Sequence, residues 1–302
     1  MGHGAPTVPA AQVSTLVASV ARIRTTLEMI KFEHSVFALP FALTGAVLAL
    51  HGWPSWRQLL WIILAMVAAR SAAMTFNRIA DLKFDALNPR TRARALPSGR
   101  LTLAFAAGFT AVSCGVLVFA AYELNPLAFK LSPLVLALLL GYSYTKRFTP
   151  WSHLVLGACL GLSPVAVWIA LRGDVKPAVV LLGVAVMFWV AGFDLIYACQ
   201  DVDFDRRQRL FSIPARYGIK AALWLSGLMH VVMLSLLIAV ARMENLGWLA
   251  FAGLALVAAL LAYEHGLVRP SDLSRLNAAF FNINGYISVL FFLTWAGDLL
   301  IH

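Results

Sequence analysis

Two acidic segments of the sequence carry residue types that suit a metal ion and a phosphate group. The first is NRIADLKFD, in which Asn77, Asp81 and Asp85 are spaced by four residues. Residues four apart lie on one face of a helix, so an amide and two carboxylates are expected to project together. Oxygen ligands of this kind suit Mg²⁺, which takes one or two carboxylates and completes its shell with phosphate and water. This segment, which arginines follow, therefore predicts a site for magnesium and diphosphate.

The second segment, FDLIYACQDVDFD, echoes the first. Asp194, Asp201 and Asp205 are seven and four residues apart and share a predicted helical face, whereas Asp203 points elsewhere and is predicted to be solvated. Two facing carboxylate helices suit Mg²⁺ ions that bridge to a diphosphate leaving group, and nearby cations would offset the charge that develops on it. Asp194 lies deepest in the apolar run, where an ionisable group is costly and is a functional candidate by default.

The composition is that of a membrane protein. Of 302 residues, 61% are hydrophobic and 13% are charged, whereas a soluble domain is about 45–50% apolar and about 25% charged. The net charge of +10 is therefore interpreted through membrane topology, and no nucleic-acid partner is predicted. Cys114, Cys159 and Cys199 lie far apart in apolar runs and fit neither a disulfide framework nor a zinc site.

We predict an all-helical bundle of nine transmembrane helices with cap loops on the cytoplasmic side. A single domain covers 1–302, with an interfacial amphipathic helix within 1–32 and the bundle over 33–302. Apolar runs of about 17–25 residues define the spans, and counts of eight or ten stay open. The predicted spans are Ser35–His51, Trp56–Phe76, Leu101–Ala121, Leu127–Tyr144, His153–Leu171, Ala178–Cys199, Ala221–Val240, Leu246–Tyr263 and Ala278–Ile301.

The basic residues sort cleanly between the two sides of this topology. Eighteen lysines and arginines fall in the N-terminal segment and in the loops after even-numbered spans, while five fall in the loops on the opposite side. Positive residues concentrate on the cytoplasmic side of membrane proteins. Both acidic segments end even-numbered spans, so the candidate site is predicted to face the cytoplasm.

At this point the sequence resembles a known family. The paired acidic motifs, together with NPRTRARALPSG, YSYTKRFTP and SIPARYG, resemble those of the UbiA superfamily of intramembrane prenyltransferases, from about Ile30 to the last span. The resemblance implies Mg²⁺, a polyprenyl diphosphate donor and an aromatic acceptor. It also implies a multi-pass protein of the bacterial inner membrane with a cytoplasmic active site, and no obligate protein partner is evident.

The resemblance also implies roles for individual residues. The magnesium and diphosphate residues would be Asn77, Asp81, Asp85, Asp201 and Asp205. By the same resemblance, Lys146 and Arg147 would contact the diphosphate. From their position beside the first acidic segment, Arg78, Arg90 and Arg94 are also predicted to bind it, with cytoplasmic anchoring as the alternative for Arg90 and Arg94. Catalytic roles are predicted for Lys146 and Tyr144, and Asp194 is the candidate base that restores aromaticity. Acceptor contacts are predicted for His34, Tyr142 and Tyr197.

The acceptor stays open between two small aromatic carboxylates. The segment KFEHSVFALPFAL, residues 31–43, resembles a bacterial branch of 4-hydroxybenzoate type that includes enzymes thought to act on a dihydroxynaphthoate. These acceptors belong to ubiquinone and menaquinone biosynthesis, respectively. Prenyl transfer in haem O, chlorophyll or homogentisate pathways is the alternative within the class.

Two further interpretations compete with an enzyme site. The acidic residues would be solvated helix ends paired with the arginines that follow them, with Lys146 and Arg147 only fixing the topology. Alternatively, the chain would be a cation-coupled transporter. Transporters place their sites near the middle of the bilayer, often at broken helices, whereas these acidic segments lie at span ends.

Overall fold

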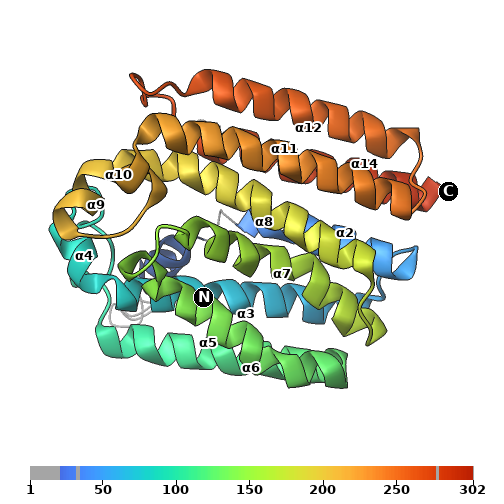
Figure 1. Cartoon of the computed structure of the whole chain (residues 1–302). Coiled ribbons are helices and arrows are strands. Elements are labelled where there is room, and N and C mark those ends of the chain that lie inside the picture. The colour runs from blue at the N-terminus through green and yellow to red at the C-terminus, as the bar shows by residue number, and fades with distance from the viewer. Residues whose placement is uncertain (1–20, 32–34, 277–278, 302) are drawn as a thin grey trace, which may run out of the picture.

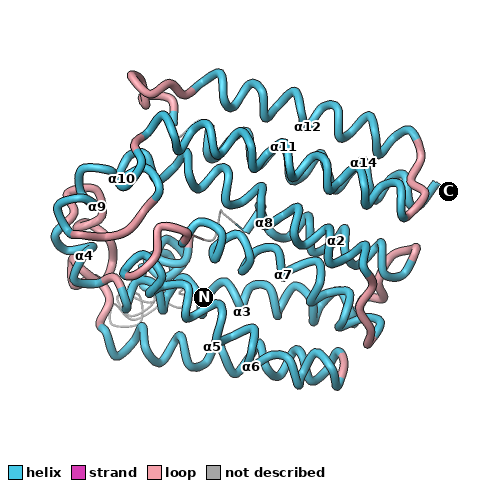
Figure 2. The backbone as a smooth tube through the Cα atoms, in the orientation of Figure 1, coloured by secondary structure: helices cyan, strands magenta, loops and turns pink. Residues whose placement is uncertain are grey.

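The protein is a helical bundle with its short helices gathered at one end. The structure, a computed structural model, describes residues 21–31, 35–276 and 279–301. Within these ranges there is no strand, and only one isolated β-bridge, between Arg269 and Asp272. Figures 1 and 2 show long helices lying roughly side by side, joined by loops at the two ends. The predicted all-helical class is confirmed.

Eight helices of the described chain are long and apolar enough to cross a membrane. They comprise α3 (Trp56–Ala80), α5 (Leu103–Leu124), α6 (Pro126–Gly141) with the short helix that continues it to Arg147, α7 (Ser152–Arg172), α8 (Pro177–Ala198) with the short helices that continue it to Gln208, α11 (Ile219–Met243), α12 (Trp248–Leu267) and α14 (Asn284–Ile301) with the turn that precedes it from Phe281. A further apolar helix, α2 (Ser35–Leu50), is shorter than these spans. The predicted spans therefore correspond to eight long helices and one shorter helix, and the chain is a multi-pass membrane protein.

Local sequence signals explain where several helices begin and end. Ser55 and Gln58 form a reciprocal capping box at the start of α3. Asn125 caps α6, whose first residue, Pro126, needs no donor at that position. Helix α7 ends at Gly173, which adopts the left-handed conformation that glycine favours.

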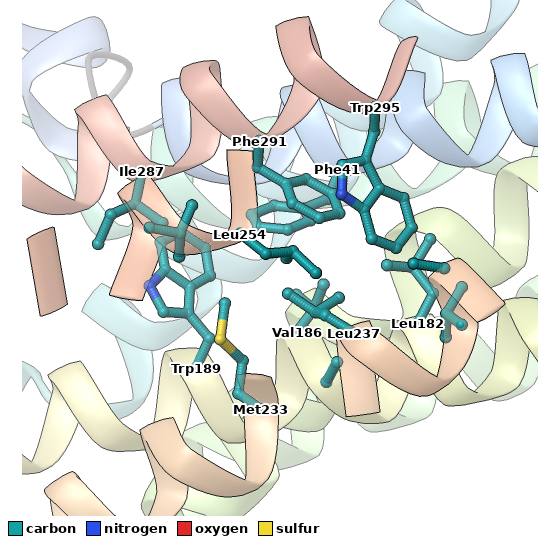
Figure 3. Close-up of a cluster of buried hydrophobic side chains, with 14 of the residues drawn as sticks. Phe41, Leu182, Val186, Trp189, Met233, Leu237, Leu254, Ile287, Phe291 and Trp295 are labelled. Carbon is teal, nitrogen blue, oxygen red and sulfur yellow. The ribbon is translucent and has the colours of Figure 1, made fainter. Parts of the chain in front are cut away.

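Helix α8 lies in the middle of the bundle and packs against both α7 and α11. Figure 1 shows α3, α5 and α6 on one side of the α7–α8 pair and α11, α12 and α14 on the other. The largest buried cluster lies on the second side. There, Phe41 stacks on Phe291 and packs beside Trp189, with ring centroids 4.8 and 4.9 Å apart (Figure 3). Helix α2 is thereby joined to α8 and α14.

Glycines let α7 and α8 approach closely. A Cβ added at Gly157 would meet the backbone carbonyl oxygen of Met187, and one added at Gly161 would meet that of Gly183. Small residues permit such close backbone contact at helix interfaces within membranes. This contact fixes the antiparallel register of the two helices, and thereby brings the first turn of α7 beside the last turns of α8.

Replacing Gly161 by valine is therefore expected to destabilise the bundle by about 1–3 kcal/mol, the usual cost of overpacking a tight interface. A lower melting temperature in detergent would reveal this loss. The matched control is Gly108→Val on α5, because a Cβ at Gly108 meets no atom within 4 Å. Equal melting temperatures for the two variants would contradict the close α7–α8 packing.

Short helices and loops cover one end of the bundle. They are α4 (Leu82–Leu87), the 3₁₀ helix η2 (Tyr142–Arg147), the 3₁₀ turn η3 (Cys199–Asp201), α9 (Val202–Gln208) and α10 (Ile213–Tyr217). Figure 1 shows α4, α9 and α10 together at this end. Because both acidic segments lie here, we call residues 77–94, 142–153 and 194–212 the acidic end.

Candidate active site

Each acidic segment contains a break between two helices that the sequence did not predict. Asp81 lies between α3 and α4 with ψ of 7°, and Asp201 ends η3, before α9, with ψ of 6°. The hydrogen bonds continue through the first break, since the Asp81 amide donates to the Asn77 carbonyl and the Asp85 amide to the Asp81 carbonyl. The last carboxylate of each segment therefore belongs to a separate short helix, while Asn77 and Asp81 share a face as the spacing predicted.

The first acidic segment is neutralised by its own arginines. The Asn77 amide donates to Asp81 Oδ2 at 3.1 Å. Asp85, only 6% exposed, accepts from Arg94 Nη1 at 2.7 and 2.9 Å, and Arg78 Nη1 lies 4.0 Å from it. Arg78 is itself buried. These pairs satisfy a buried carboxylate that would otherwise be costly.

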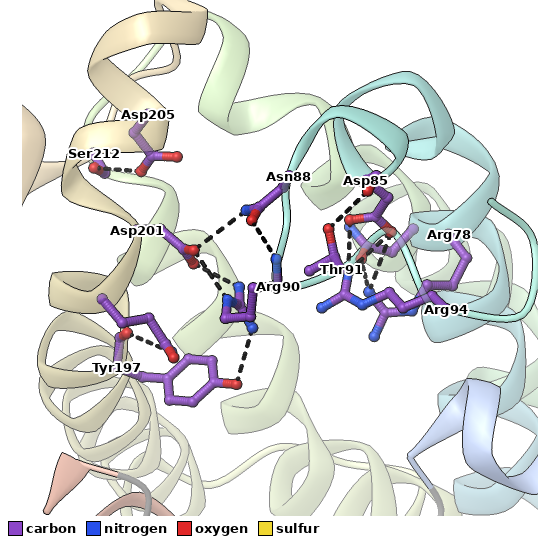
Figure 4. Close-up of polar contacts among 12 residues, drawn as sticks. Arg78, Asp85, Asn88, Arg90, Thr91, Arg94, Tyr197, Asp201, Asp205 and Ser212 are labelled. Atoms are coloured by element: carbon purple, nitrogen blue, oxygen red, sulfur yellow. Dashed lines mark hydrogen bonds and ion pairs between the residues drawn. The ribbon is translucent and has the colours of Figure 1, made fainter. Parts of the chain in front are cut away.

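Arg90 joins the two acidic segments. Its guanidinium group donates to both oxygens of Asp201, from Nε at 3.1 Å and from Nη2 at 2.6 Å (Figure 4). The Asn88 amide also donates to Asp201, at 3.4 Å, and Asn88 accepts from the Arg90 backbone. A two-pronged arginine–carboxylate contact fixes orientation as well as charge, so the loop after α4 is held across the end of α8.

Asp205 is held by a hydroxyl group. Its Oδ2 accepts from Ser212 Oγ at 2.8 Å, and the Asp205 side chain is 2% exposed. Ser212 Oγ also accepts from the Ala215 amide and so caps α10. The SIPARYG segment therefore supports the second acidic segment directly, a contact that the sequence pattern alone did not reveal.

Helix η2 lies between the two acidic segments. Arg147 Nη2 donates to the Ala80 carbonyl at 2.6 Å and lies 3.5 Å from Asp81 Oδ1, while the Lys146 carbonyl accepts from the Phe211 amide at 2.7 Å. The Lys146 ammonium group interacts electrostatically with four carboxylates from the two segments, namely Asp205, Asp194, Asp201 and Asp81. Lys146 is thus, with Arg90, a cation whose charge acts on both segments.

The predicted tyrosines occupy different positions. The Tyr197 hydroxyl accepts from Arg90 Nη1 at 3.4 Å, which places this residue beside Asp201. The Tyr142 hydroxyl group interacts electrostatically with the carboxylates of Asp194 and Asp81. The Tyr144 ring is 41% exposed and packs under the Arg147 guanidinium group, 4.8 Å from ring centroid to Cζ. The catalytic role predicted for Tyr144 stays a prediction, and His34 lies outside the described residues.

Asp194 has a partner that sequence analysis did not single out. His153 Nδ1 lies 2.7 Å from Asp194 Oδ2, and the imidazole is 1% exposed. The close packing of α7 on α8 produces this pair across 41 residues of sequence. His153 begins a predicted span, and only the register of the two helices could have revealed its contact with Asp194.

Charge and burial shift the acid–base properties of the exposed part of the site. Burial and the neighbouring Asp85 carboxylate raise the pKa of Asp81 above its ordinary value, although Lys146 and Arg147 oppose this. Burial lowers the pKa of Arg90, but its contact with Asp201 outweighs that effect and leaves the pKa raised. An additional cation would therefore stabilise the ionised form of the Asp81 carboxylate, while the Arg90 guanidinium group stays charged.

The donor set fits a metal that is shared with a phosphate ligand. In the part of the chain that the structure describes, no three histidine, cysteine or acidic side chains converge to hold a metal by themselves. Mg²⁺ needs only one or two carboxylates when phosphate and water complete its shell. Asp81, with the Asn77 amide beside it, and Asp201 each supply such carboxylate oxygens, and both carboxylates interact electrostatically with Lys146.

Comparison with known proteins places this arrangement in a family. The sequence profile of the UbiA prenyltransferase family matches residues 38–286. The chain belongs to this family. It is therefore a prenyltransferase, and the match covers every acidic and basic residue of the acidic end described above.

Relatives that carry a functional name match most of the chain. A 4-hydroxybenzoate octaprenyltransferase of Alkalilimnicola ehrlichii is 32% identical over 85% of this chain and 87% of its own length. A protein of the same name from Vibrio parahaemolyticus is 31% identical over 81% and 85%, respectively.

Solved UbiA structures share the fold. An apo structure of a UbiA homologue from Aeropyrum pernix K1 superposes with a TM-score of 0.79 at 36% identity, covering 89% of this chain and 97% of that one. A UbiA homologue from Archaeoglobus fulgidus bound to DMAPP and Mg²⁺ has a TM-score of 0.70 at 18% identity, over 92% and 99%. The second likeness concerns the fold alone.

Proposed function

We propose that this UbiA protein transfers a polyprenyl group from a polyprenyl diphosphate to 4-hydroxybenzoate or a dihydroxynaphthoate, with Mg²⁺, in quinone biosynthesis. The observation that carries the proposal is that Arg90 and helix η2, which holds Lys146 and Arg147, join the two acidic segments. The names of the bacterial relatives support a 4-hydroxybenzoate-like acceptor. We place the reaction at the cytoplasmic face of a bacterial inner membrane, because the basic loops gather at the acidic end.

The acidic end supplies the groups that a departing diphosphate needs. Bound Mg²⁺ would neutralise the leaving group and fix its orientation. Asp81, Asp201 and their neighbours Asn77, Asp85 and Asp205 are the residues that would hold it. Three arginines pair with these carboxylates in the structure, namely Arg90, Arg94 and Arg147. When diphosphate is bound, the same guanidinium groups would stabilise its negative charge.

The apolar bundle supplies the other half of the chemistry. An allylic cation that forms when diphosphate leaves must be kept from water, and the faces of aromatic rings stabilise cations. Phe76 packs against Tyr144 at the end of α3, with ring centroids 5.9 Å apart. The prenyl chain would extend from the acidic end into the surrounding helices, which offer an apolar environment.

Chelation of divalent metal is expected to lower product formation by at least ~10²-fold, because metal assistance of this kind is worth several kcal/mol. The measurement is transfer of a radiolabelled polyprenyl group in detergent, with EDTA and then with Mg²⁺ restored. Recovery on Mg²⁺ addition controls for denaturation. Full activity in EDTA would contradict the proposed metal dependence.

A paired acceptor assay tests the function itself. Purified protein receives Mg²⁺, a radiolabelled polyprenyl diphosphate, and either 4-hydroxybenzoate or 1,4-dihydroxy-6-naphthoate. Lipid product with the benzoate alone assigns the ubiquinone route, and product with the naphthoate alone assigns the menaquinone route. Failure with both acceptors would refute the proposed substrate class and direct the search to the other prenyl acceptors.

A further inference from the structure

His153 is a buried histidine with one satisfied nitrogen and one unsatisfied nitrogen. Its Nδ1 lies 2.7 Å from Asp194 Oδ2. Its Nε2 is buried and has no hydrogen-bond partner among the residues that the structure describes. An unsatisfied buried polar atom costs about 1–3 kcal/mol. The contact with Asp194 is therefore the one hydrogen bond that holds the buried His153 ring in the described chain.

The short contact assigns the proton on the histidine ring. A carboxylate accepts hydrogen bonds, so Nδ1 carries the proton and donates it to Asp194 Oδ2. The ring is thus fixed by one hydrogen bond, as in triads where a histidine and an aspartate orient each other. A donor at Oδ2 fixes the rotation of the carboxylate group, which determines where Oδ1 points.

Asp194 lies between His153 and the charges of the site. The Asp194 side chain is 17% exposed, whereas that of His153 is 1% exposed. The Asp194 carboxylate interacts electrostatically with Lys146 and Tyr142, both on η2. His153 makes the only hydrogen bond to Asp194 from described residues. One carboxylate oxygen is therefore fixed by the histidine, and the other is available to a ligand.

We propose that Asp194 accepts the ring proton of the aromatic acceptor and that His153 is the residue that positions Asp194 for this step. The inference rests on the proposed prenyl transfer. The bond from the first prenyl carbon to the diphosphate oxygen breaks, and its electron pair leaves with diphosphate. A ring carbon of the acceptor then bonds to the prenyl carbon. The C–H electron pair of that ring carbon restores aromaticity, and its proton passes to Asp194 Oδ1.

This division of labour separates proton removal from diphosphate departure. The groups proposed to act on diphosphate are the carboxylates of Asp81, Asp85, Asp201 and Asp205 with the nearby arginines. In the described chain His153 makes no hydrogen bond or ion pair with any of them, and its only electrostatic interaction with this set is with Asp205. Loss of His153 should therefore slow deprotonation while binding and ionisation of the donor continue. A merely structural role would affect both steps together.

The test compares the wild-type protein, His153→Leu and His153→Asn in detergent with Mg²⁺ and polyprenyl diphosphate. The productive acceptor carries either hydrogen or deuterium at the ring carbon that is alkylated. In His153→Leu, kcat is expected to fall ~10²-fold, the usual contribution of a positioned base, with an isotope effect that rises from about 1 to above about 2. The KM for the donor should stay within about two-fold of the wild-type value, because diphosphate binding does not use His153. His153→Asn keeps a donor near the Nδ1 position and should recover most of kcat.

A second measurement needs no acceptor. Ionisation of a donor labelled with ¹⁸O at the bridging oxygen scrambles the label, and His153→Leu should scramble it at the wild-type rate. Unchanged kcat in His153→Leu, or loss of scrambling with no rise in the isotope effect, would overturn the positioning role. Absence of product from the wild-type protein with both acceptors would instead overturn the proposed function, so the two failures are distinguishable. Melting temperatures show whether each variant is folded. If His153→Leu is unfolded, the kcat and isotope effect of His153→Asn decide between a positioning role and a structural role.

Discussion

Replacing Asp201 by asparagine is expected to lower prenyl transfer by ~10³-fold or more, because it removes a carboxylate from the proposed metal and diphosphate site. Asp201 accepts from both Arg90 and Asn88, so it joins the two acidic segments as well as facing the shared Lys146. Asparagine keeps the shape and loses the charge. The Mg²⁺ concentration that gives half-maximal rate should therefore rise, and this is measured in the same labelled-product assay.

Asp203→Asn is the matched control for this prediction. Asp203 lies two residues away on α9, is exposed, and makes no side-chain ion pair in the described chain. Asp203→Asn removes the same charge from the same end of the protein as Asp201→Asn, so a general electrostatic effect on activity would appear in both variants. Activity near the wild-type value in Asp201→Asn, or an equal loss in Asp203→Asn, would refute the site assignment. Asp81→Ala should behave like Asp201→Asn.

The site as described is already neutralised by its own cations. Arg94 covers Asp85, Arg90 covers Asp201 and Arg147 lies beside Asp81. Carboxylates that end helices at a membrane surface require such partners, so the pairs alone fit the interpretation of solvated helix ends. Two features argue against that interpretation. Asp85 and Asp205 are buried instead of solvated, and Lys146 interacts with carboxylates of both segments.

Much of this arrangement was predictable from the sequence because it depends on local spacing. The apolar runs predicted the long helices, and the placement of lysines and arginines predicted that the acidic segments share one end of the bundle. The four-residue spacing also predicted that Asn77 and Asp81 would meet. These features follow from helix geometry and hydropathy, which act over a few residues.

The remaining features depend on how helices pack, which spacing does not encode. The breaks at Asp81 and Asp201 place Asp85 and Asp205 on the separate short helices α4 and α9, which the four-residue spacing alone does not indicate. The contact of His153 with Asp194 requires the α7–α8 register that glycines permit. Ser212 was part of a recognised motif, yet its bond to Asp205 depends on the loop between α9 and α10.

Replacing Lys146 by methionine is expected to lower kcat by ~10²–10³-fold, because it removes a fixed positive charge from the place where diphosphate charge develops. The side chain changes while the backbone contact from Phe211 to the Lys146 carbonyl is retained. An apolar chain of similar length preserves packing. Lys83→Met, on the exposed surface of α4, loses the same charge from the same end of the protein and serves as the control.

The two active-site variants should differ in their Mg²⁺ requirement, which separates the roles of acid and base. Without the Lys146 ammonium group, the carboxylates near it repel one another more strongly and attract a divalent cation more strongly. Lys146→Met should therefore reach half-maximal rate at the same or a lower Mg²⁺ concentration, whereas Asp201→Asn should need more. A higher Mg²⁺ requirement in Lys146→Met would mean that the lysine organises the carboxylates for metal binding. A loss of kcat without that increase would mean that it acts on the departing diphosphate.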